Sequence, residues 1–181
     1  GDDIVLVGTS SDSGGGLDEI YKRIMIAGGD GEADRLVLDS GDDKGNQNGV
    51  MRSTTISGLL NGFIFNKTRT VQDIVYTGME VVEVYLSPES NTFKIESTAP
   101  DSSTKIVGGD MADTFYVNET QGDLRLEAGG GDDKIILNGL GDGATALIYG
   151  DAGDDYLEID GRGASNVDLA NSLGNSTVKW S

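Results

Sequence analysis

Aspartate and glycine recur together in this chain, in short stretches that are each followed at once by β-forming residues. The clearest stretch is Gly108–Val117, GGDMADTFYV. Carboxylates and main-chain carbonyls are the ligands of Ca2+, which takes about six to eight oxygens. Glycine lets the backbone turn its carbonyls toward one point. These residue types at this spacing therefore indicate a divalent-cation site in a turn that the following strand anchors.

The same stretch recurs along the chain. The other copies are GDDIVLV (1–7), GDGEADRLVL (29–38), AGGGDDKIIL (128–137), GDAGDDYLEI (150–159) and a degenerate LSPESNTFKI (86–95). They align on the last turn residue, which is Asp3, Asp34, Asn91, Asp113, Asp133 or Asp155. The second and fourth residues after it are apolar in every copy, and side chains two apart on a strand share a face. The turn therefore sets the register of the core.

The elements around these turns predict an all-β fold. A second strand precedes several of the turns, and the last intervals are 22, 20 and 22 residues (91→113→133→155). That is the length of one two-stranded coil, so we expect residues 1–181 to form one continuous parallel β-solenoid of the β-roll or β-helix kind, with about seven coils. The turn aspartates should then lie on one edge. The residues that should be buried are Phe115, Val117, Leu124, Leu126, Ile135, Leu137, Leu157 and Ile159.

The middle of the chain departs from this rhythm. Residues 39–53 are polar and glycine-rich, which favours a loop excursion from the stack. Residues 54–65 could form another coil, with Asn61 in its turn and Phe63 and Phe65 facing inward. Only 16–25 carries a helical signal, and it can equally be a loop that leads into a strand.

A longer period relates 1–38 to 128–165. Asp3 aligns with Asp133 and Asp34 with Asp155, which are separations of 130 and 121 residues. This internal repeat of about 121–130 residues is typical of a long tandem protein rather than of a free-standing enzyme.

The turns resemble the RTX, or haemolysin-type, calcium-binding repeats of secreted bacterial proteins, whose pattern is G-G-x-G-x-D-x-U-x with U a large apolar residue. The resemblance implies a right-handed parallel β-roll with Ca2+ between turns on the same side. It assigns the ligand role to Asp34, Asp113, Asp133, Asp155 and Asp3. The other turn acids, Asp30, Asp110, Asp132, Asp151 and Asp154, are candidate further ligands.

This chain departs from the RTX pattern in its spacing. RTX repeats run nine residues with glycine- and aspartate-rich turns on both edges, whereas here one such turn occurs per 20–22 residues. Several calcium ions are therefore expected along one edge only. The alternative is a set of solvated, metal-free turns, because Gly, Asn and Asp favour turns in any case.

The composition excludes several functions. The net charge of −18 repels nucleic acid and anionic membranes. With no Cys and no His, thiol chemistry, zinc sites built on these residues and His-dependent triads are excluded. No apolar run approaches the ~20 residues of a membrane span. The many carboxylate pairs are accounted for by the turn motif, so we expect no enzymatic activity.

The sequence thus predicts a calcium-stabilised structural or adhesive segment of a large extracellular or cell-surface repeat protein, such as a filament, surface layer or adhesin stalk. Two alternatives remain open. One is a non-catalytic calcium-binding module attached to a secreted enzyme, and the other is a carbohydrate- or ice-binding module. The expected partners are neighbouring copies of the chain in a filament or array, and surface glycans.

Overall fold

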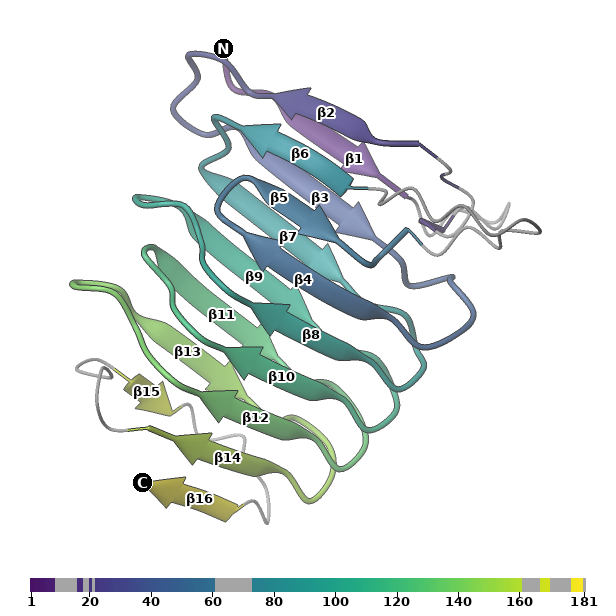
Figure 1. Ribbon diagram of the computed structural model, residues 1–181, viewed down its shortest axis with the longest axis vertical. Helices are drawn as coiled ribbons and strands as arrows, with labels where there is room; N and C mark the ends of the chain where they lie inside the picture. Colours follow the sequence, from purple (N-terminus) through teal and green to yellow (C-terminus); the bar gives the residue numbers. More distant parts are fainter. Residues whose placement is uncertain are drawn as a thin grey trace.

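The computed structural model describes residues 1–8, 16–17, 20, 22–60 and 73–160, and the backbone of two further strands at 167–169 and 177–180. Over these residues the fold is all-β and contains no helix, and two sheets lie face to face (Figure 1). The described residues accordingly contain no helix of the length and hydropathy that a membrane span requires.

Each sheet gathers strands from the whole length of the chain. The seven-stranded sheet runs β1 (Ile4–Val7), β3 (Arg35–Asp39), β7 (Val81–Tyr85), β9 (Ser103–Val107), β11 (Asp123–Glu127), β13 (Ala146–Tyr149) and β15 (Val167–Leu169). The nine-stranded sheet runs β16 (Thr177–Trp180), β14 (Tyr156–Ile159), β12 (Lys134–Leu137), β10 (Thr114–Val117), β8 (Thr92–Ile95), β4 (Asn48–Arg52), β5 (Thr55–Ser57), β6 (Asp73–Thr77) and β2 (Ile24–Ala27).

From β7 onward the chain alternates between the two sheets, and we call each pair of consecutive strands, one per sheet, a level. Each strand pairs in parallel with the corresponding strand of the levels before and after it. The register carries no slip, so that Phe115 lies beside Phe93 on one side and beside Ile135 on the other. Such rows of similar residues arise because each strand begins at the same distance from its turn motif.

The middle of the chain interrupts this alternation within the nine-stranded sheet. Strand β5 pairs antiparallel with both β4 and β6, which adds two strands to this sheet. The expectation of a loop over 39–53 is wrong for its second half, because β4 pairs in parallel with β8 there. Gly49 permits this pairing, since a Cβ at that position would lie 2.3 Å from the ring of Phe93. Asn61, Phe63 and Phe65 lie outside the described residues.

The core lies between the two sheets and confirms the predicted register. Every residue expected there is at most 2 % exposed: Phe115, Val117, Leu124, Leu126, Ile135, Leu137, Leu157 and Ile159. Leu36 and Leu38 are fully buried as well. Val5 and Val7 face the same way but are only partly buried, because β1 is the last strand of its sheet.

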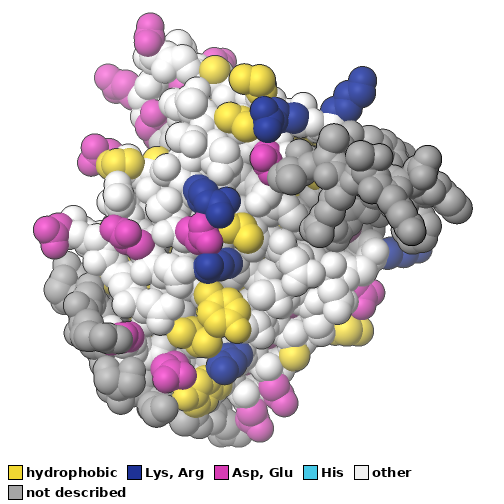
Figure 2. Space-filling view, in the orientation of Figure 1, with side chains coloured by type: hydrophobic (Ala, Val, Ile, Leu, Met, Phe, Trp, Pro, Cys, Tyr) yellow, Lys and Arg dark blue, Asp and Glu magenta, His cyan; other side chains and the backbone are white. Residues whose placement is uncertain are grey.

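Lysine and arginine side chains stand mainly on the outer faces of the sheets. On the nine-stranded sheet, Arg52 and Lys94 pair with Glu96 at 2.7 and 2.8 Å, and Lys134 lies 5.8 Å from the ring centroid of Tyr156. Figure 2 shows Lys and Arg in a column down one face, alternating with hydrophobic and acidic side chains, while other acidic side chains lie toward the margins.

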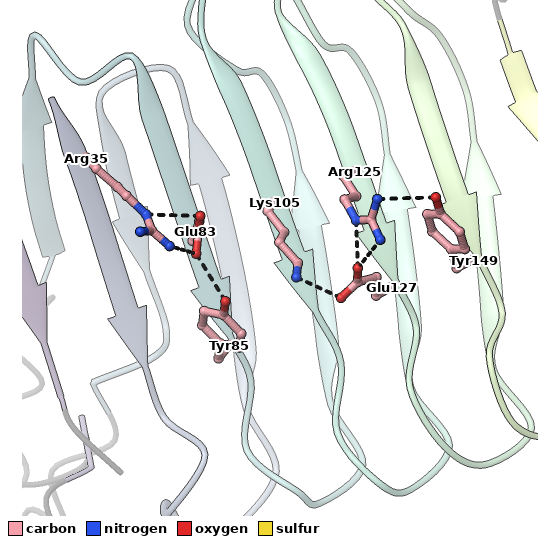
Figure 3. A network of polar contacts seen from close by, with 7 residues as sticks. All are labelled: Arg35, Glu83, Tyr85, Lys105, Arg125, Glu127 and Tyr149. Carbon is pink, nitrogen blue, oxygen red and sulfur yellow. Dashed lines mark hydrogen bonds and ion pairs between the residues drawn. The ribbon is translucent and has the colours of Figure 1, made fainter. Parts of the chain in front are cut away.

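The seven-stranded sheet carries a similar network on its outer face, drawn in Figure 3 as Arg35, Glu83, Tyr85, Lys105, Arg125, Glu127 and Tyr149. Glu83 accepts hydrogen bonds from Arg35 at 3.0 and 2.7 Å and from the hydroxyl of Tyr85 at 3.0 Å. Burial alone would raise the pKa of Glu83, but these hydrogen bonds outweigh it and hold that pKa below its ordinary value. The cations of this network are thus engaged with acids on the strands rather than with acids in the turns.

Candidate cation-binding edges

The turns between the sheets form two separate edges. Turns that run from the seven-stranded to the nine-stranded sheet carry Asn91, Asp113, Asp133 and Asp155, and we call this side the Asp113 edge. The turn from β2 to β3 runs the other way and carries Asp34, and Asp3 precedes β1 on the same side; we call this side the Asp34 edge. Figure 1 shows the two sets of turns at opposite margins. The expectation that all these aspartates share one edge is therefore wrong.

The ten sequence-predicted ligands divide into two groups by burial. Asp34, Asp113, Asp133 and Asp155 are at most 2 % exposed. The exposed group is Asp3, Asp30, Asp110, Asp132, Asp151 and Asp154. The aligned last turn residue is thus a buried group in four of its five aspartate copies, whereas the neighbouring acids lie at the surface.

The Asp113 edge is a ladder of side-chain oxygens, each of which accepts a main-chain N–H from the level before it. The N–H of Asn91 donates to Asp113 Oδ1 at 2.6 Å, that of Asp113 to Asp133 Oδ1 at 2.7 Å, and that of Asp133 to Asp155 Oδ1 at 3.1 Å. Gln47 begins the series by donating its N–H to Asn91 Oδ1 at 3.0 Å. The ladder satisfies a buried N–H at each level that no strand pairing reaches.

The Asp34 edge repeats this arrangement at its own levels. The N–H of Asp3 donates to Asp34 Oδ1 at 2.6 Å, and the N–H of Asp34 donates to Glu80 Oε2 at 2.8 Å. Glu80 therefore supplies the oxygen that an aspartate supplies elsewhere. Sequence analysis missed Glu80 because it lies outside the glycine- and aspartate-rich stretches, and it missed Gln47 because residues 39–53 were expected to leave the stack as a loop.

The second carboxylate oxygen, Oδ2, has a hydrogen-bond partner at some ladder positions and none at others. Asp113 Oδ2 accepts the N–H of Gly109 at 2.8 Å. In contrast, Asp34 Oδ2 and Asp133 Oδ2 are buried and have no hydrogen-bond partner. A buried polar atom without a partner costs about 1–3 kcal/mol, and more when it is charged. Each edge therefore carries at least one carboxylate oxygen that a positively charged partner would stabilise.

Burial raises the pKa of two of the ladder carboxyl groups, those of Asp113 and Asp133. The pKa of Asp133 is raised to about 8, mainly by burial and also by the carboxylates of Asp113, Asp155 and Asp132, against the hydrogen bond from the N–H of Asp113. The pKa of Asp113 is raised by burial and is lowered in part by the N–H groups of Gly109 and Asn91. The charged ladder is thus a high-energy arrangement unless a proton or a cation offsets it.

At three of the turns a glycine lies beside the ladder aspartate, and its role there is to leave space rather than to supply an unusual backbone angle. Gly108 does not have a positive φ. A Cβ at Gly108 would lie 1.9 Å from the carbonyl oxygen of Ala128 and 2.6 Å from Asp113 Oδ2. Gly28 and Gly150 stand against Asp34 and Asp155 in the same way, at 2.7 and 2.2 Å from Oδ2. At these three turns the glycine thus leaves room for the aspartate, whereas Ala128 stands at the corresponding position before Asp133.

Replacing Gly108 by alanine should therefore destabilise the chain by about 2 kcal/mol or more, because the backbone of the next level must move away from the new methyl group. Gly41→Ala is the matched control: its Cβ would meet only Asp39 Oδ1, at 3.1 Å. We expect the control to shift stability by less than about 1 kcal/mol. Urea unfolding at a fixed calcium concentration measures both, and equal midpoints would contradict this account of the motif.

The donor set fits a cation only with help from the backbone. Among the described residues, no three Asp or Glu side chains converge on a position where they could together hold a metal ion. A Ca2+ ion at Asp34 or Asp133 would therefore take one or two carboxylate oxygens and draw its other ligands from main-chain carbonyls and water. Comparison of the chain with protein-family models, curated proteins and solved structures found no match.

Proposed function

We propose that this chain is a calcium-stabilised structural or adhesive segment of a large extracellular repeat protein, built as a parallel β-solenoid of about seven levels. The strand pairing supports this architecture, since from β7 onward consecutive strands alternate between the sheets and each level repeats the register of the one before. Stacked levels bury one continuous core, which lets such a protein extend by adding repeats.

The observation that carries the proposal is the buried row of carboxylates at each edge. Coulomb repulsion between aligned acids opposes stacking, and levels about 4.8 Å apart bring them close. In the described part of the chain, Asp34, Asp113 and Asp133 form no ion pair with Lys or Arg. Ca2+ supplies two positive charges and accepts the oxygen ligands that these turns offer. We therefore propose ions at both edges.

A structural role suits these carboxylates better than a catalytic one. A general acid or base must reach the proton it transfers, within about 2.6–3.2 Å or through a water molecule. The side chains of Asp34, Asp113 and Asp133 are almost completely buried. In each of them one carboxylate oxygen accepts a hydrogen bond from a main-chain N–H of the neighbouring level. Their geometry joins levels together and presents no open face to a substrate.

The proposed location follows from the same dependence on calcium. Calcium is scarce in the cytosol and abundant outside the cell, so a stack that needs the ion would form after export. In a repeat protein of this kind the natural neighbours are further levels and further copies, which gives a filament or array. Surface glycans remain the proposed target if the segment is adhesive.

Calcium binding measured by equilibrium dialysis tests the proposal. We expect the wild-type chain to bind ions at both edges, and Asp34→Ala and Asp133→Ala each to lose about one ion, because each removes a buried carboxylate with an unpartnered oxygen. Asp101→Asn is the control, since Asp101 is exposed in another turn and has φ 56°, a conformation that asparagine tolerates. A wild-type chain that binds no calcium would overturn the proposed function.

A further inference from the structure

Asn91 occupies the same ladder position as the buried aspartates, and its Oδ1 likewise accepts a main-chain N–H hydrogen bond from the level before it. Its Oδ1 accepts the N–H of Gln47 at 3.0 Å, just as Asp133 Oδ1 accepts the N–H of Asp113 at 2.7 Å. Asn91 is 4 % exposed and Asp133 is 1 % exposed. The two positions are therefore matched in burial and in one hydrogen bond, which makes the rest of each side chain directly comparable.

The second polar atom of each side chain, Nδ2 of Asn91 and Oδ2 of Asp133, differs in its hydrogen bonding. Asn91 Nδ2 donates to the carbonyl oxygens of Ser87 at 2.9 Å and Glu89 at 2.6 Å. Asp133 Oδ2 has no partner at all. The NH2 group of Asn91 thus offers positive charge density to two backbone carbonyl oxygens. A cation bound between a carboxylate and carbonyl ligands would do the same.

The turn before Asn91 is built for an amide and would not suit a carboxylate. The N–H of Ser87 donates to Gln47 Oε1 at 3.2 Å, and Pro88 has no N–H to offer. The hydroxyl of Ser87 donates to Asn91 Oδ1 at 2.8 Å. The donors in reach are therefore directed to the first oxygen or elsewhere, and carbonyl oxygens face the second atom.

Asp113 provides a third case on the same edge. Both of its oxygens accept main-chain N–H groups, from Asn91 at 2.6 Å and from Gly109 at 2.8 Å. Its turn supplies the positive partner from the backbone. Of these three positions, only Asp133 is left with an unsatisfied oxygen.

We propose that the side-chain amide of Asn91 takes the place that a divalent cation of the calcium class holds at Asp133, so that the level of Asn91 is cation-independent and the level of Asp133 is cation-dependent. This inference rests on the proposed calcium function and refines it. The Asp113 edge is then not a uniform metal array: the residue at each ladder position sets whether that level needs an ion.

Asparagine substitutions at two neighbouring positions test this assignment. Asp133→Asn in excess chelator should raise the melting temperature by about 5 °C, because it removes a buried negative charge and keeps the acceptor for the N–H of Asp113. The same variant should bind about one calcium ion fewer than the wild type and gain less from calcium. Asp113→Asn should instead lower the melting temperature by a similar amount in both conditions, since both of its oxygens are already used as acceptors.

The reverse substitution provides a second measurement. Asn91→Asp should lower the melting temperature in chelator, because it aims a carboxylate oxygen at two carbonyls, and calcium should restore more of that loss than an equal ionic strength of sodium. If Asp133→Asn keeps the full calcium stoichiometry and the full calcium-induced gain while the wild type binds calcium, this inference is wrong and the proposed function stands. If the wild type binds no calcium, the proposed function itself fails.

Discussion

In excess chelator the chain should lose most of its thermal stability, and in millimolar calcium it should melt cooperatively at a much higher temperature. We expect this result because Asp34 and Asp133 each place an unpartnered buried oxygen in the fold. An ion that binds only the folded state at a hundred times its dissociation constant adds about 2.7 kcal/mol. Two such sites contribute about 5 kcal/mol, which is comparable to the whole stability of a small domain, about 5–15 kcal/mol.

Circular dichroism with thermal melting measures this effect, and two controls separate ligation from screening. Sodium chloride at matched ionic strength relieves the repulsion of the −18 net charge without filling a site. Magnesium, which prefers a strict octahedral shell and keeps its waters, should replace calcium poorly. The same strand signal and melting temperature in chelator and in calcium would show that the carboxylate ladders form without metal.

Phe115→Ala should cost about 3–5 kcal/mol, the range for truncating a fully buried aromatic side chain. Phe115 is 0 % exposed and lies in register between Phe93 and Ile135, so the cavity opens in the middle of the stacked row. Its strand neighbour Tyr116 points to the opposite face and is only partly buried. Tyr116→Ala on the same strand should therefore cost less than half as much.

Guanidine or urea unfolding in calcium gives both values, and the order of the two costs is the informative result. A one-residue slip in register would exchange the two faces of the strand. A larger loss for Tyr116→Ala than for Phe115→Ala would therefore show that the register is shifted by one residue. It would also remove the basis for placing Asp113 at the turn.

The local part of this structure could be predicted from the sequence, because the motif couples a turn to a strand. After Asp113, apolar side chains two and four residues on face the core, and both are fully buried. The same holds at Asp34, Asp133 and Asp155. Short-range rules of period and turn chemistry are sufficient here, since everything they describe lies within ten residues.

The edge on which a turn lies could not be predicted in this way. Both edges join one strand to another strand, so the residues of a turn are suited equally to either side. From the turn of Asp34 to that of Asn91, the latter included, the chain crosses between the sheets three times, an odd number, and therefore arrives on the opposite edge. Counting those crossings requires knowing that β4, β5 and β6 all belong to one sheet, which depends on long-range pairing rather than on local pattern.

The fate of the second carboxylate oxygen could not be predicted either. Asp113 and Asp133 occupy the same position in the motif, yet only Asp113 receives an N–H from its own turn. That difference depends on how one peptide group is oriented: the turn of Asp133 contains positive φ angles at Gly129 and Gly131, and the turn of Asp113 contains none. The sequence marks Asn91 as a departure from the pattern, but it does not indicate the two carbonyls that the amide contacts.

The ladder of main-chain N–H to side-chain oxygen also has a direction. On each edge the donor belongs to one level and the acceptor to the level that follows it in the chain. A polypeptide that leaves a ribosome or an export channel with its N-terminus first therefore presents every level with its donor exposed. The matching acceptor emerges between 20 and 46 residues later, so each level is completed only when the level after it has left the channel.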